Sequence, residues 1–218
     1  MLRYRTPPFI TLFLALSACS SPYAEHPIKP IRSSQSLNDI WDNDYRFFIG
    51  QPTPDRFSVC HSMSCYKISE ASINKQDWQN ILTLFANTDS AEDERQAVQQ
   101  GIANLEHLVG IQIGSQHDLA RNQIASNRYG QMDCVDEATN TSVYLRMLEN
   151  AGVLTWHTTA SRMSRGIFQG QAPHNTATMI DTQTQIRYAV DSWFYENGKA
   201  PVIINLDKWM SGWEPEQQ

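Results

Sequence analysis

The segment 133–150 constrains the fold most, because its apolar residues recur at the spacing of a helix. Asp133 is a favourable N-cap, and Gly152 is a residue at which a helix commonly stops. One stripe along the segment holds Cys134, Ala138, Thr141, Leu145 and Leu148. The pattern therefore predicts a helix with Cys134 in its first turn, on the inward face.

Residues 173–194 predict an antiparallel hairpin with arms at 174–180 and 185–192. The intervening Asp-Thr-Gln-Thr is typical of a turn, although it lacks the Asn-Gly signature. A helix followed by such a hairpin indicates an α+β fold, with the helix packed on an antiparallel sheet.

A two-residue turn between Asp181 and Thr184 sets the register expected for this hairpin. His174 then lies directly opposite Asp191, with the two Cβ atoms ~5 Å apart. Their face also carries Thr176 and Ala189, which are small enough to let a helix approach. The more apolar face pairs Asn175, Ala177 and Met179 with Val190, Tyr188 and Ile186.

Three further segments predict structural elements around this centre. A helix is expected over 90–109, capped by Ser90 and ended by Gly110. Its expected core face holds Val98, Ile102, Leu105 and Leu108. A shorter helix is expected over 76–86, and a strand over 153–160.

The first 36 residues predict an export signal and a tether. Arg3 and Arg5 precede an apolar run at 9–16 that is far shorter than the ~20 residues of a spanning helix. The Leu-Ser-Ala-Cys that ends at Cys19 resembles the bacterial lipoprotein signal, in which that cysteine is lipidated and becomes the mature N-terminus. An ordinary secretory signal cut near Ala18 is the alternative.

These features divide the chain into a signal peptide at 1–18, a lipidated Cys19 with a Ser- and Pro-rich tether at 19–36, and one folded domain at 37–218. By resemblance to sorted lipoproteins, Ser20 favours an anchor in the outer membrane, with the domain facing the periplasm. The net charge of -6 over 218 residues, without a basic run, argues against nucleic-acid binding. No phosphate-binding glycine loop is present, so no nucleotide cofactor is suggested.

The four cysteines of an exported chain separate into different roles. Cys60 and Cys65 are expected to form a disulfide. A metal pair with His61 is the alternative. Cys134 is then left over, either as a small buried hydrophobe or as a catalytic thiol.

The order of Cys134, His174 and Asp191 is that of a nucleophile, its base and the group that orients the base. The N-terminus of a helix stabilises a thiolate, and the Cys134 backbone N–H there is a candidate oxyanion donor. Gln131 is a second candidate donor, by analogy with papain-like enzymes. His157 is a rival base.

Three segments resemble the transglutaminase-like members of the papain-like superfamily, above all the transglutaminase-like cysteine peptidases of the bacterial periplasm. They are Met-Asp-Cys-Val-Asp-Glu around Cys134, His-Asn-Thr-Ala from His174, and Val-Asp-Ser around Asp191. The resemblance covers about residues 90–195. It implies a transglutaminase-like α+β core with Cys134, His174 and Asp191 as the triad.

The resemblance also bears on calcium, because acids flanking the cysteine help to bind it in the peptidases. Asp133 matches one such acid, Val135 does not, and Asp136 is displaced. A calcium requirement is therefore doubtful, and no other cofactor is expected.

These inferences predict a periplasm-facing lipoprotein that attacks amide bonds of protein or peptide substrates through a thioester. Hydrolysis is favoured over transfer to an amine. The alternative is an inactive transglutaminase-like module that serves in envelope binding or assembly.

Overall fold

The computed structural model describes residues 50–123 and 129–216. The expected signal peptide at 1–18, Cys19, the tether at 19–36 and the first part of the domain, 37–49, lie outside the described residues. Within the described ranges, no helix is both long and apolar enough to cross a membrane.

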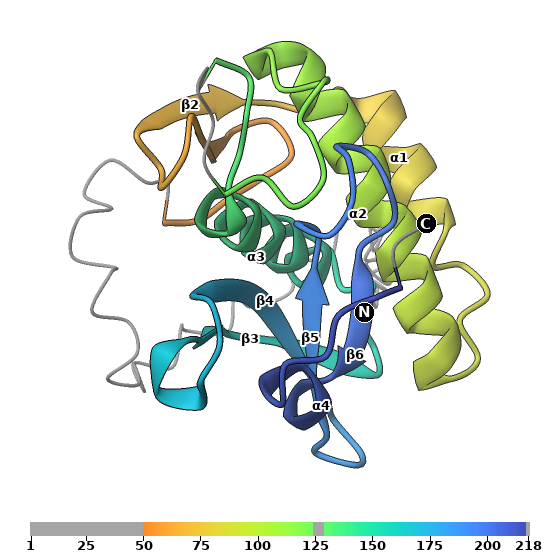
Figure 1. The fold of residues 1–218 in the computed structure, drawn as a ribbon. Coiled ribbons are helices and arrows are strands. Elements are labelled where there is room, and N and C mark those ends of the chain that lie inside the picture. Colours follow the sequence, from red (N-terminus) through yellow and green to blue (C-terminus); the bar gives the residue numbers. More distant parts are fainter. Residues whose placement is uncertain (1–49, 124–128, 217–218) are drawn as a thin grey trace, which may run out of the picture. The chain divides into compact units, whose positions relative to one another are not determined.

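The described chain is an α+β structure, as the sequence predicts, and it contains two antiparallel sheets (Figure 1). A two-stranded sheet pairs β1 with β2, and a four-stranded sheet has the order β3-β4-β5-β6. The elements are β1 (Phe57–His61), β2 (Lys67–Ala71), α1 (Lys75–Thr83), α2 (Ala91–Ile113), α3 (Cys134–Asn150), β3 (His157–Arg165), a short 3₁₀ helix (Ile167–Gln169), β4 (His174–Asp181), β5 (Arg187–Asp191), β6 (Val202–Asn205) and α4 (Leu206–Met210).

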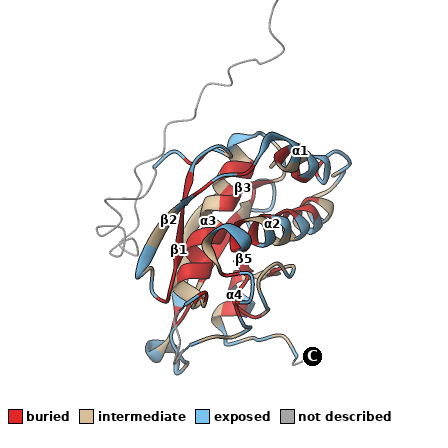
Figure 2. Ribbon diagram, turned by 90° about the horizontal axis from the view of Figure 1, so that it is seen from above, coloured by how far each residue is buried: buried red, intermediate tan, exposed pale blue. Residues whose placement is uncertain are grey.

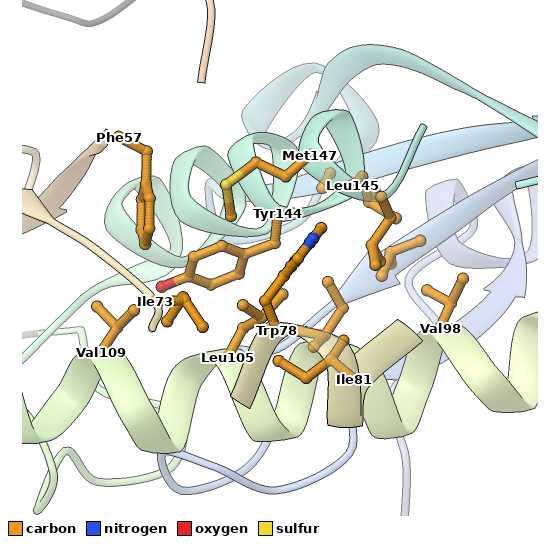
Figure 3. Packing of buried hydrophobic residues seen from close by; sticks show 14 of the residues in the cluster. Phe57, Ile73, Trp78, Ile81, Val98, Leu105, Val109, Tyr144, Leu145 and Met147 are labelled. Atoms are coloured by element: carbon orange, nitrogen blue, oxygen red, sulfur yellow. The ribbon is translucent and has the colours of Figure 1, made fainter. Parts of the chain in front are cut away.

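Helix α3 is the centre of the fold and is largely buried (Figure 2). Its residues Tyr144, Leu145 and Met147 pack with side chains of α1, α2 and β1 in one apolar cluster (Figure 3). Burying each large apolar side chain contributes about 1.5–3 kcal/mol, so this cluster fixes α3 against both sheets. The start of α3 is thereby held in one position.

The helix starts follow the predicted caps. Asp133 caps α3 in a capping box with Asp136, and Ser90 caps α2. The predicted end of α2 at Gly110 is wrong, because α2 continues to Ile113 and ends at Gly114, which has a left-handed φ of 80°. The short helix begins and ends slightly earlier than predicted, and β3 starts four residues later than the predicted strand at 153–160.

The predicted register of the β4–β5 hairpin is wrong by two residues. Ala177 pairs with Val190 and Met179 with Tyr188, so His174 lies diagonally across from Asp191. The cause is the turn, which spans four residues from 182 to 185 and places Gln185 at a φ of 61°. A shift of two residues keeps each side chain on its predicted face.

The two faces of the larger sheet are covered by different helices. Helix α3 packs on the apolar face that holds Ala177, Met179 and Val190. The small Ala189 on the opposite face packs against α4 instead, through Leu206 and Trp209. A helix thus approaches the Ala189 face, as the small residues predict, and that helix is α4.

Candidate active site

Cys134 is the first residue of α3 and is half-buried. Its thiol is free, whereas Cys60 and Cys65 are joined in a disulfide. The first N–H groups of a helix have no partner within it, so the backbone N–H of Cys134 remains a candidate oxyanion donor.

His174 begins β4 and Asp191 ends β5, and both side chains are buried. Their diagonal position across the hairpin still brings His174 Nε2 to 2.7 Å from Asp191 Oδ2. The carboxylate thus orients the imidazole through its Nε2 nitrogen.

The other imidazole nitrogen of His174, Nδ1, is buried and has no hydrogen-bond partner among the described residues. Burial alone would lower the pKa of His174, but the charge and hydrogen bond of Asp191 and the neighbouring Cys134 side chain raise it to about 9. The Asn175 amide donates to Cys134 Sγ at 3.6 Å. With Nε2 engaged by Asp191, Nδ1 is the nitrogen that can exchange a proton with the thiol.

Three aromatic rings enclose the imidazole of His174. The ring centroids of Trp193, Phe194 and Trp209 lie 4.5, 5.4 and 5.4 Å from that of His174. All three residues are buried. The enclosure keeps water away from the His174–Asp191 pair. Two opposite charges attract each other more strongly in such an interior than they do in water.

Trp209 is a site residue that sequence reasoning missed. Its indole Nε1–H donates to Asp191 Oδ2 at 2.7 Å. The only signal was the Trp-rich C-terminus, whose position in the fold cannot be obtained from local patterns.

Gln131, the second oxyanion candidate, is engaged in its own loop. Its Nε2 donates to the carbonyl oxygens of His117 and Gly130 at 3.1 and 3.3 Å. Its Oε1 accepts from Asn122 Nδ2 at 2.5 Å. These bonds give the amide of Gln131 a structural use in the segment that leads to Cys134.

The two doubtful calcium ligands bind main-chain N–H groups instead. Asp136 accepts from the N–H groups of Met63 and Cys65 at 2.8 and 2.6 Å. Asp133 accepts from the N–H of Ser64 at 2.9 Å. Burial, with the nearby Asp133, raises the pKa of Asp136 to about 7.

The alternative metal pair is not set up either. With the disulfide closed, the sulfur atoms of Cys60 and Cys65 are bonded to each other rather than available as thiolates. Both ring nitrogens of His61 face hydroxyl groups, those of Ser62 and Ser69.

The rival base His157 lies in another part of the structure and has its own acid. His157 Nδ1 is 2.9 Å from Glu94 Oε1, and both side chains are fully buried. The Glu94 carboxylate also accepts the backbone N–H groups of Thr155, Trp156 and His157, so it ties the start of β3 to α2. This His–Glu pair therefore stabilises the packing of β3 against α2.

Glu106, Asp118 and Glu137 form a buried acid cluster, in which the carboxyl groups interact with one another. Burial raises the pKa of Glu106 to about 7 and that of Asp118 to about 6, and it raises the pKa of Glu137 well above its ordinary value. Asp118 accepts the N–H of Met132 at 2.8 Å, which joins the cluster to the segment before Cys134.

Neither the protein-family models nor the curated proteins and solved structures that were searched contain a match to this chain. The function proposed below therefore rests on the geometry around Cys134.

Proposed function

We propose that the chain is a thiol enzyme of the transglutaminase-like type that cleaves, or transfers, amide bonds of protein or peptide substrates. The observation that carries this proposal is the His174–Asp191 pair, whose second imidazole nitrogen is left for Cys134. A nucleophile, a base and an orienting acid are the three parts that acyl transfer through a covalent intermediate needs.

The nucleophile of this chemistry is the thiolate form of Cys134. His174 starts as the imidazolium, since a pKa of about 9 keeps that ring charged at neutral pH. The thiolate attacks the carbonyl carbon, and the N–H of Cys134 stabilises the oxyanion. His174 then gives its proton to the leaving amine as the C–N bond breaks, which leaves a thioester. Water, deprotonated by His174, then attacks the thioester, which releases the carboxylic acid product and frees Cys134. An amine in place of water gives transfer.

The location belongs to the same proposal. A lipid on Cys19 would anchor the domain to the outer membrane, facing the periplasm, and the Cys60–Cys65 disulfide is compatible with that oxidising compartment.

Alkylation of Cys134 tests the thiol chemistry without a known substrate. The full chain is treated with iodoacetamide between pH 5 and 10, and the modified Cys134 peptide is quantified by mass spectrometry. An ordinary thiol, with a pKa of ~8.5, is almost wholly protonated at pH 6, so rapid alkylation there indicates an ion pair. His174→Ala should slow the reaction at pH 6 by at least about tenfold and leave it similar at pH 10.

The opposite result is slow alkylation at pH 6 that His174→Ala does not change. It would reject the enzyme and favour the inactive envelope-binding module with this fold.

A further inference from the structure

The Asp191 carboxylate receives N–H groups from two different elements on the same oxygen. His174 Nε2 and Trp209 Nε1 each lie 2.7 Å from Asp191 Oδ2. The other oxygen, Oδ1, accepts the backbone N–H of Trp193 at 3.3 Å. Trp209 is fully buried, and its ring also faces the His174 imidazole.

The second donor on Oδ2 matters because, without it, the Asp191 carboxylate would keep only the bond to His174 on that oxygen and the longer bond of 3.3 Å from the Trp193 N–H on Oδ1. Hydrogen bonds to a charged group are stronger than neutral ones, and they impose a direction. The Trp209 N–H therefore fixes the plane of the Asp191 carboxylate, and that plane sets the ring of His174. The same indole fills the space that water would otherwise occupy beside the pair.

Arg165 holds Trp209 in place from the end of β3. Its guanidinium donates to the carbonyl oxygens of Trp209 and Trp213, and it stacks over the Trp209 ring at 4.5 Å. Arg165 is itself buried and pairs with His174 in the β3–β4 register. Gln171 adds a bond from its Nε2 to the carbonyl of Met210 at 3.0 Å.

A second arginine ties the end of the same segment to the loop beside Trp193. Arg121 binds Glu214 at 2.5 Å and the carbonyl of Pro215 at 3.0 Å. Its backbone N–H donates to the carbonyl of Trp193 at 2.8 Å. The segment 206–216 thus forms a strap, with α4 on the sheet face away from α3 (Figure 1).

We infer that Trp209 is a positioning residue for Cys134 chemistry, acting through Asp191 and His174, and that the strap 206–216 exists to hold it there. This inference rests on the proposed thiol function. It assigns to the C-terminal segment a role that the Cys, His and Asp motifs do not contain.

The test compares Trp209→Phe with Trp156→Phe in the full chain. Phe keeps a ring in the space but removes the N–H. The matched change at Trp156 also removes an indole N–H, one that donates to the carbonyl of Thr88 and not to Asp191. We expect Trp209→Phe to lower the alkylation rate of Cys134 at pH 6 by about tenfold, the effect of losing one hydrogen bond to a charged group. The gap should close near pH 10, where any thiol ionises. Trp156→Phe should follow the wild type throughout.

A measurement on the wild type keeps the inference testable if Trp209→Phe does not fold. In the ¹H–¹⁵N spectrum, the Trp209 indole N–H should be protected from exchange and should shift with the midpoint at which His174 titrates. The Trp213 indole should not follow that midpoint.

The outcomes separate this inference from the proposed function. Slow wild-type alkylation at pH 6 overturns both. Rapid alkylation that depends on His174 but is unchanged in Trp209→Phe overturns the positioning role alone. A Trp209 indole signal whose chemical shift does not change as His174 titrates has the same consequence.

Discussion

The backbone N–H of Cys65 donates to Asp136 Oδ1 at 2.6 Å, which fastens the disulfide loop to the first turn of α3. Four consecutive residues of that loop, 62 to 65, have positive φ angles between 52° and 69°. Such a backbone is unfavourable for residues other than glycine, so it persists only where surrounding bonds hold it. Asp136 and Asp133 supply those bonds.

Replacement of Asp136 should therefore unfold the chain at lower urea concentration. Asp136→Ala leaves the buried N–H groups of Met63 and Cys65 without their acceptor, at a cost of about 2–4 kcal/mol in the free energy of unfolding. Glu70→Ala, which breaks an exposed ion pair with Arg56, is the matched control and should cost less than about 1 kcal/mol. Equal losses in the two variants would contradict the anchoring role of Asp136.

Stability should fall as the pH rises from about 4 to 9. The pKa values of Glu106 and Asp118 are raised in the folded state, so between pH 4.5 and about 7 the folded chain binds more protons than the unfolded chain. The free energy of unfolding then drops by about 1.4 kcal/mol for each unit by which a pKa is raised. His174, with a pKa raised to about 9, adds a loss between pH 6.5 and 9.

Urea denaturation at a series of pH values measures this trend. Glu106→Gln carries no charge, so its stability should fall less steeply between pH 5 and 8 than that of the wild type. A wild-type profile that rises over this range would contradict the raised pKa values. Below about pH 4 the trend reverses, because Glu94 has a lowered pKa and loses its native bonds when it is protonated.

Two glycines of α2 should respond in opposite ways to alanine. A Cβ on Gly110 would lie 2.7 Å from Asn197 Nδ2, and that amide already donates to the carbonyl of Glu106. A Cβ on Gly101 would meet its nearest atom, in the Phe85 ring, at 3.5 Å. Gly101→Ala should stabilise the helix by about 0.5–1 kcal/mol, whereas Gly110→Ala should destabilise the chain by about 1–3 kcal/mol. Thermal unfolding of the pair checks both signs.

Gly110 also shows why one predicted boundary was wrong. A glycine after an apolar stripe predicts a helix end, but this glycine serves the close approach of Asn197, and the helix ends at Gly114. The start of α3 was predictable because its cap, Asp133, and the acids after it are local features. Local signals identify a cap more surely than they distinguish two uses of glycine.

The β4–β5 hairpin likewise separates what a local pattern predicts from what tertiary geometry decides. Alternation along the strands was enough to put His174 and Asp191 on one face, but the register depends on a turn in which Gln185, not a glycine, takes the left-handed conformation. The bond from Trp209 to Asp191 joins residues 18 apart through a strand and a helix. A contact of that kind depends on how β6 and α4 fold back, which no local pattern carries.

The last prediction concerns His157 and His174, two buried histidines that each have a carboxylate partner, of which only His174 adjoins Cys134. His157→Ala removes the bond to Glu94 and leaves a cavity, which should cost about 2–4 kcal/mol of stability. It should leave Cys134 alkylation at pH 6 unchanged, since no step of the proposed chemistry uses His157. His174→Ala should slow that alkylation by at least about tenfold. Urea unfolding and peptide mass spectrometry on the same samples separate the two effects. Slowed alkylation in a folded His157→Ala chain would return His157 to consideration as the base.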